Sequence, residues 1–183
     1  MLHRLTELDA KIRRAVETHD WTGVYPEIHQ FCATDLSAFY FDIRKDALYC
    51  DASDAPRRRA ARTVLDILHR CLCAWFAPVL VFTAEEAWLA RFPDEDGSVH
   101  LLDFPFVPEG WKDQALAAKW ARLRDLRRAV TGALERARVA QEIGSSLQAA
   151  PVLHLGADDA ALETAIAKVA EDRLGGLTPK GIR

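Results

Sequence analysis

The chain has 183 residues, of which half are apolar and 28% are charged, a composition that supports a buried core and excludes a disordered polypeptide. Its net charge of −3 excludes a general basic field, so contact with nucleic acid would need a local cluster of cations. No apolar stretch is long enough to span a membrane, and the four cysteines form no Cys-x-x-Cys pair. We therefore expect a soluble, cytoplasmic protein with no metal site and no membrane contact.

The first two predicted elements are amphipathic helices. Leu5, Leu8, Ile12 and Val16 recur at helical spacing, which predicts a helix over residues 1–19. A second helix is expected after the turn at residues 20–25, with Thr22 as its N-cap and Pro26 in its first turn. Its apolar face consists of Ile28, Cys32, Leu36, Phe39 and Ile43.

Arg44 and Lys45 mark the expected end of this second helix. Cations at a helix C-terminus complement the helix dipole, which contributes about 0.3–1 kcal/mol at an exposed site. This stabilisation alone would explain the presence of Arg44 and Lys45, without any role in binding.

A third helix is predicted to start near Pro56, with Ser53 as a capping residue, and to end at Pro78. Its apolar positions follow a seven-residue pattern: Ala61, Leu65, Leu68, Leu72 and Trp75. Residues 83–86, Thr-Ala-Glu-Glu, read as a capping box that opens a short helix to about Arg91.

The second half of the chain begins with a segment rich in proline and glycine at residues 92–111, which we expect to be irregular. A long charged helix follows over residues 112–142. Its predicted buried stripe consists of Leu116, Trp120, Leu123, Leu126, Val130, Leu134 and Ala137. A short strand at 151–155 and a helix at 158–174 complete the prediction.

We therefore expect an all-α bundle of four to five helices at residues 1–148. The start of a small, truncated C-terminal α/β unit would occupy residues 149–183. The uncapped opening residues also suggest a fragment of a longer chain.

Three phrases identify a family. Residues 39–51 read Phe-Tyr-Phe-Asp-Ile-Arg-Lys-Asp-Ala-Leu-Tyr-Cys-Asp, residues 82–88 read Phe-Thr-Ala-Glu-Glu-Ala-Trp, and residues 143–147 read Ile-Gly-Ser-Ser-Leu. Together they resemble the anticodon-binding domain of bacterial-type isoleucyl-tRNA synthetases, which belong to subclass Ia of the class I aminoacyl-tRNA synthetases. The chain departs from the family's pattern at Ala140 and Gln141, where a lysine is common.

The resemblance implies binding of the tRNA(Ile) anticodon stem-loop by a monomeric piece of a larger synthetase. ATP and magnesium would act in the parent's catalytic domain, and this fragment would need no cofactor. The chain contains no glycine-rich phosphate loop, no His-Glu-x-x-His and no Gly-x-Ser-x-Gly. We therefore expect no catalytic residues here and no aminoacylation by the fragment alone.

The candidate RNA-binding residues form two sets. Arg44 and Lys45 precede a turn that Arg57, Arg58, Arg59 and Arg62 follow, so an antiparallel helix pair would gather these six cations at one end. The alternative is a solvated face in which nearby aspartates such as Asp42, Asp46, Asp51 and Asp54 neutralise these cations.

Trp88, Arg91 and Trp111 form the second set, since unpaired bases stack on aromatic rings and guanidinium planes. A tryptophan on an amphipathic helix is more often part of the core, and that interpretation of Trp88 comes first.

Three other functions stay open on the sequence. A valine, leucine or methionine synthetase would have a similar domain, and a helical protein-interaction module would have similar apolar stripes. A free-standing enzyme is the third, and the lack of a catalytic constellation argues against it.

Overall fold

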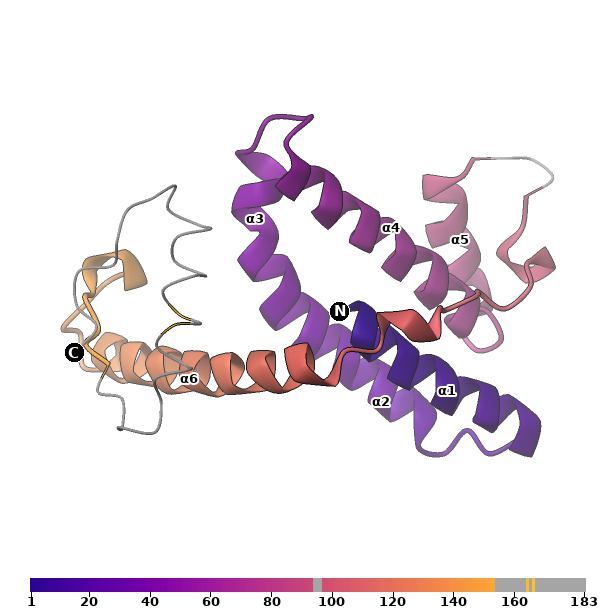
Figure 1. Cartoon of the computed structure of the whole chain (residues 1–183), viewed down its shortest axis with the longest axis horizontal. Helices are drawn as coiled ribbons and strands as arrows, with labels where there is room; N and C mark the ends of the chain where they lie inside the picture. The colour runs from indigo at the N-terminus through magenta and orange to yellow at the C-terminus, as the bar shows by residue number, and fades with distance from the viewer. Residues whose placement is uncertain (94–96, 154–163, 165, 167–183) are drawn as a thin grey trace. The chain divides into compact units, whose positions relative to one another are not determined.

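The computed structural model describes residues 1–93, 97–153, 164 and 166, and these residues are predominantly helical (Figure 1). The chain divides into two compact units, Met1–Lys112 and Asp113–Arg183. The first contains α1 (Leu2–Thr18), α2 (Val24–Gln30), the π-helical segment η1 (Phe31–Phe41), α3 (Asp42–Tyr49), α4 (Pro56–Phe76), α5 (Val81–Arg91) and the 3-10 turns η2 (Val99–Leu101) and η3 (Glu109–Trp111). The second contains α6 (Gln114–Val139) and η4 (Ser146–Gln148).

The all-α prediction is confirmed. The boundary expected between residues 148 and 149 stays a prediction. The strand expected at 151–155 and the helix expected at 158–174 fall on residues that are only partly described. No helix among the described residues is both long and apolar enough to cross a membrane.

The core of the first unit joins α1, the second helix and α4. Leu5, Leu8 and Ile12 are almost fully buried on α1, as the sequence predicts, whereas Val16 is 40% exposed because Ala15 takes the inward position. They lie in one cluster with Trp75 of α4, which is completely buried. Burial of such side chains is the main favourable term in folding.

The second helix is continuous from Val24 to Tyr49, four residues beyond the predicted end at Lys45. Its middle is π-helical, and π turns are rare in proteins. The wider turn places Phe31 and Tyr40 in the core beside the predicted Leu36.

Thr22 does not cap this helix. Gly23 is the N-cap, without a side-chain bond, because the Thr22 hydroxyl donates to Asp20 Oδ1 at 2.6 Å. Pro26 lies in the first turn as expected.

α4 begins with Pro56 at its first position, as predicted, but its N-cap is Ala55 and Ser53 makes no capping bond. The capping box at residues 83–86 was also wrong, because α5 begins at Val81 and Thr83 already lies inside it. Glu85 binds the following loop instead. Its Oε2 accepts hydrogen bonds from Ser98 Oγ at 3.0 Å and from Val99 N at 2.9 Å.

In the second unit, Asp113 caps α6 by accepting a hydrogen bond from Leu116 N at 2.8 Å. The predicted stripe is present on this helix, yet no residue of α6 is buried. Leu116 is 48% exposed and Trp120 is only half-buried, so the assignment of Trp120 to the core was wrong.

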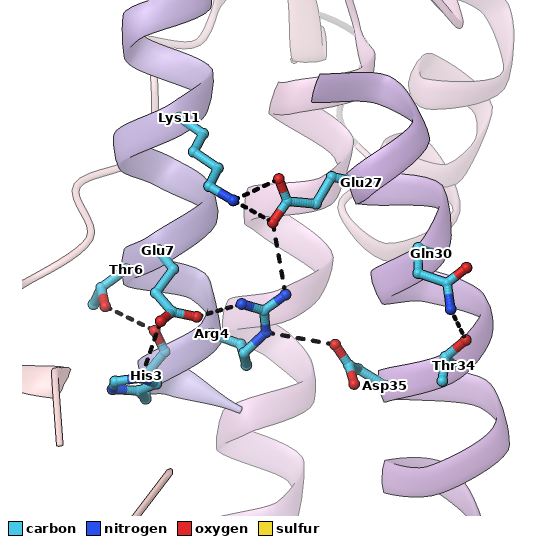
Figure 2. Close-up of polar contacts among 9 residues, drawn as sticks. All are labelled: His3, Arg4, Thr6, Glu7, Lys11, Glu27, Gln30, Thr34 and Asp35. Atoms are coloured by element: carbon cyan, nitrogen blue, oxygen red, sulfur yellow. Dashed lines mark hydrogen bonds and ion pairs between the residues drawn. The ribbon is translucent and has the colours of Figure 1, made fainter. Parts of the chain in front are cut away.

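Ion pairs link α1 to the second helix (Figure 2). Arg4 of α1 contacts three carboxylates: that of Glu7, that of Glu27 at 3.8 Å and that of Asp35 at 3.5 Å. Lys11 binds both oxygens of Glu27 at 2.7 Å. Burial opposes ionisation of Glu7, but the hydrogen bond and charge of Arg4 outweigh it and lower the pKa of this carboxyl.

Leu8→Ala tests the core of the first unit. Removing a side chain that is 1% exposed leaves a cavity, so the free energy of unfolding should fall by about 2–5 kcal/mol in urea titrations followed by circular dichroism. Leu101→Ala, at a residue that is 78% exposed, is the matched control and should change it by less than about 0.5 kcal/mol. Equal losses in the two variants would contradict this description of the core.

Candidate nucleic-acid interface

The end of α3 and the start of α4 form a helical hairpin in which the two helices contact each other (Figure 1). Its turn is residues 50–55. The hairpin brings the helix with Arg44 and Lys45 beside the helix with Arg57, Arg58 and Arg62, so the first candidate set lies on two adjacent elements.

Arg57 and Arg58 are used to hold this turn. Arg57 donates from Nε to Asp51 Oδ2 at 2.7 Å and from an Nη to Asp51 Oδ1 at 2.6 Å, a two-bond pair. Arg58 donates to the Asp51 carbonyl oxygen at 2.7 Å. The hydrogen bonds from Arg57, with the charges of both arginines, lower the pKa of the Asp51 carboxyl. Arg57 thus has a carboxylate partner, as the solvated-face alternative expects, and its contact with RNA stays a prediction.

Arg44 and Lys45 do not end their helix, so their interpretation as cations at a helix C-terminus was wrong. Arg44 lies over the buried Tyr40 ring at 5.7 Å and is half-buried. Lys45 is different, because its side chain is 63% exposed and its ion-pair partner within the described part of the chain is the exposed Asp42 at 3.0 Å. Arg62, and Arg59 three residues before it, are exposed and form no ion pair with any carboxylate among the described residues.

Trp88 and Arg91 lie elsewhere. They belong to α5, which packs on the C-terminal half of α4, and Arg91 contacts Asp66 at 3.2 Å. From Arg57 to Arg70, the α4 cation nearest to Trp88, the helix rises about 20 Å. Arg62, however, lies one helical turn before Asp66, the partner of Arg91, so the two candidate sets adjoin each other along α4.

Trp88 is 7% exposed, as its interpretation as a core residue predicts. Its ring lies 4.5 Å from Phe92 and 6.4 Å from His69, and the Arg70 guanidinium lies over Phe92 at 4.2 Å. These contacts leave little of the Trp88 ring free for a nucleobase.

A cavity of about 340 Å³ adjoins Trp88, between α4 and the irregular segment before α6. Its lining is mostly apolar and includes Arg70, Cys71, Trp88, Asp103, Phe106 and Trp111. It brings Trp111 near Trp88, as the sequence suggested, although the Arg91 guanidinium does not line it.

Two features were missed by the sequence reasoning. Tyr49 is 81% exposed at the end of α3, and it was overlooked because the helix was expected to stop at Lys45. Arg70 pairs with Asp66 at 3.0 Å over an aromatic cluster, and its spacing of four from Asp66 could have indicated that pair. No group of histidine, cysteine, aspartate or glutamate within the described ranges is arranged to hold a metal.

The Asp51 pair should make stability depend on pH. A carboxyl whose pKa is lower in the folded state stabilises the fold above its unfolded pKa of about 3.9 and loses that effect as the pH falls through the folded value. Asp51→Asn should therefore lower the urea midpoint at pH 7, and its difference from the unmodified chain should shrink from about pH 5 downward.

The matched control for this titration is Asp54→Asn, which removes an exposed carboxylate from the same turn. A difference between Asp51→Asn and the unmodified chain that stays constant from pH 7 to pH 3 would contradict the assigned role of Asp51.

The sequence model of the family described as the anticodon-binding domain of tRNA ligase matches residues 1–153. The isoleucine–tRNA ligase of Gluconobacter oxydans is 62% identical over 163 residues, which cover 88% of this chain and 17% of that protein. Those of Mesorhizobium japonicum and Ruegeria pomeroyi are 53% and 51% identical over 92% and 95% of this chain. The chain thus spans less than a fifth of the length of these relatives. It belongs to the family of anticodon-binding domains of tRNA ligases.

Proposed function

We propose that this chain binds the anticodon stem-loop of tRNA(Ile) as part of a monomeric, cytoplasmic isoleucine–tRNA ligase. Support comes from the family match and from relatives that are isoleucine–tRNA ligases over almost the whole chain. A valine, leucine or methionine enzyme and a protein-interaction module are not favoured by these similarities. In this proposal ATP and magnesium act in the parent's catalytic part, and this segment contributes binding without a cofactor.

The observation that carries the proposal is the α3–α4 hairpin with its exposed cations. Lys45, Arg59 and Arg62 are exposed, and the two helices that carry them pack against each other. RNA phosphates attract such cations, and the release of condensed counterions provides affinity that does not depend on sequence. Because the net charge of the chain is −3, the chain as a whole does not attract RNA. A local group of cations such as this one would therefore be needed to direct RNA to this region.

The hairpin also divides its arginines between two roles. Arg57 and Arg58 fix the turn through Asp51. A fixed turn holds Lys45 and Arg62 in place before RNA arrives, which reduces the conformational entropy lost on binding. Lys45 and Arg62 would then contact phosphates, while Arg57 and Arg58 would act mainly as positioning residues.

Charge-neutral variants test this division. Lys45→Gln and Arg62→Gln should each weaken binding of an unmodified tRNA(Ile) transcript several-fold in fluorescence anisotropy. Each should also reduce the slope of log Kd against log salt concentration by about 0.7–0.9, the value for one phosphate contact. Arg14→Gln removes the same charge from an exposed position on α1 and should leave both quantities unchanged.

The proposed function fails if the unmodified chain binds tRNA no better than it binds a random acidic polymer, or if its affinity does not depend on salt. The assignment to the hairpin fails separately, if Arg14→Gln weakens binding as much as Lys45→Gln does.

A further inference from the structure

The helical run Val24–Tyr49 carries two exposed aromatic rings on one face near its C-terminal end. Tyr49 is 81% exposed and Phe41 is 42% exposed. Residues on the opposite side of the same helix are in the core, since Tyr40 is 7% exposed and Ala47 is 3% exposed. The exposure of Tyr49 and Phe41 is therefore specific to one face.

These rings flank a cation. Phe41, Lys45 and Tyr49 follow one another at intervals of four, from the N-cap of α3 to its last residue. In an α-helix each such step turns the side chain by about 40° and advances it by about 6 Å. The three side chains thus form one row, aromatic, cationic, aromatic, along the helix.

The row is suited to an unpaired nucleic-acid strand. Aromatic side chains stack against the faces of bases, and a cation between them is placed for the phosphate that links two nucleotides. The Phe41 ring lies near the ring of the buried Tyr40, with the two ring centroids 6.4 Å apart. The Lys45 pair with Asp42 is exposed on both sides, so a phosphate can replace it at little cost.

Single exposed apolar side chains are normal on protein surfaces and need no explanation. This row differs because two rings and a cation share one face and because that face ends at the hairpin turn, where Arg59 and Arg62 are also exposed. Both aromatic rings and cations at one place are what single-stranded RNA requires, whereas a protein partner would not need the cations.

We propose that Phe41, Lys45 and Tyr49 form a stacking face for unpaired nucleotides of the bound RNA. Tyr49 holds a base against its ring, Lys45 contacts the adjoining phosphate, and Phe41 extends the face toward the core. This inference rests on the proposed function and adds to it a contact with unpaired bases, beyond the contacts with the phosphate backbone.

Tyr49 is the residue to vary, since Tyr49→Phe keeps the ring and Tyr49→Leu removes it. With an anticodon stem-loop RNA and the full 183-residue chain, Tyr49→Leu should weaken binding by about 5- to 100-fold, the range for loss of one stacked base. Tyr49→Phe should stay within about twofold of the unmodified chain. The salt slope should be unchanged in both variants, because neither removes a phosphate contact.

Two controls separate stacking from general damage. Phe82→Leu changes an aromatic residue on α5 that is 88% exposed and should leave affinity unchanged. A fully paired RNA duplex without the loop should bind the unmodified chain and Tyr49→Leu equally, because it offers no unpaired base. Photocrosslinking of a loop substituted with 5-bromouracil, mapped by mass spectrometry, should label Tyr49 or Phe41.

The stacking face is refuted if Tyr49→Leu binds the stem-loop as well as the unmodified chain does. It is also refuted if Tyr49→Phe loses as much affinity as Tyr49→Leu, since the hydroxyl and not the ring would then make the contact. In either case the unmodified chain still binds tRNA with a salt dependence, so the proposed function survives. Absence of any binding by the unmodified chain overturns both.

Discussion

The unbroken helical run from Val24 to Tyr49 is the constraint on which the rest of the first unit depends. Its beginning is tied to α1 by the Arg4 ion pairs, and its middle contributes Phe31 and Leu36 to the cluster around Trp75. Because the helix continues past this core, its last two helical turns carry Arg44 and Lys45 and lead into the hairpin turn at residues 50–55. An end at Lys45 would have removed the helical row and moved the turn toward the core.

Apolar periodicity was enough to predict most of the core. The stripes of α1 and α4 were predicted from spacing alone, and Trp75 was correctly placed inside. The π-helical segment could not be predicted in this way, because an α-helical period includes the buried Phe39 and the half-buried Cys32 but omits Phe31 and Tyr40, which also lie in the core. A few residues of wider turn change which side chains face inward without changing the composition.

Capping was the least predictable level of structure. Thr22 and Thr83 both have the right residue type, but the direction in which the chain enters each helix decides whether a hydroxyl can reach the free N–H groups. Asp20 takes the Thr22 hydroxyl, and Glu85 is drawn to the backbone of the loop that follows α5. Asp20 is only two residues from Thr22, so that contact is local, whereas Ser98 and Val99 are distant from Glu85 in the sequence and only the tertiary structure reveals their contact.

The candidate interface shows the same limit in its charges. The sequence placed six cations on the two helices of one hairpin, which do pack against each other, yet it could not divide them, because the division depends on which of four nearby aspartates each cation meets. Asp51 pairs with Arg57, six residues further along the chain. This spacing spans a turn, so the spacing of three or four that predicts ion pairs within a helix does not predict it. Lys45, among the described residues, pairs with the exposed Asp42.

That division has an energetic consequence for binding. A bidentate pair at Asp51 orders the turn in the absence of RNA, so in the proposed interface the ordering cost would be met during folding and not during recognition. Exposed cations such as Arg62 form no ion pair with a carboxylate among the described residues, so in the proposed interface they would stay available to phosphate. In the proposed interface the hairpin would thus be ordered before RNA arrives and would still carry exposed cations, and the exposed Tyr49 lies at the end of α3, next to the same turn.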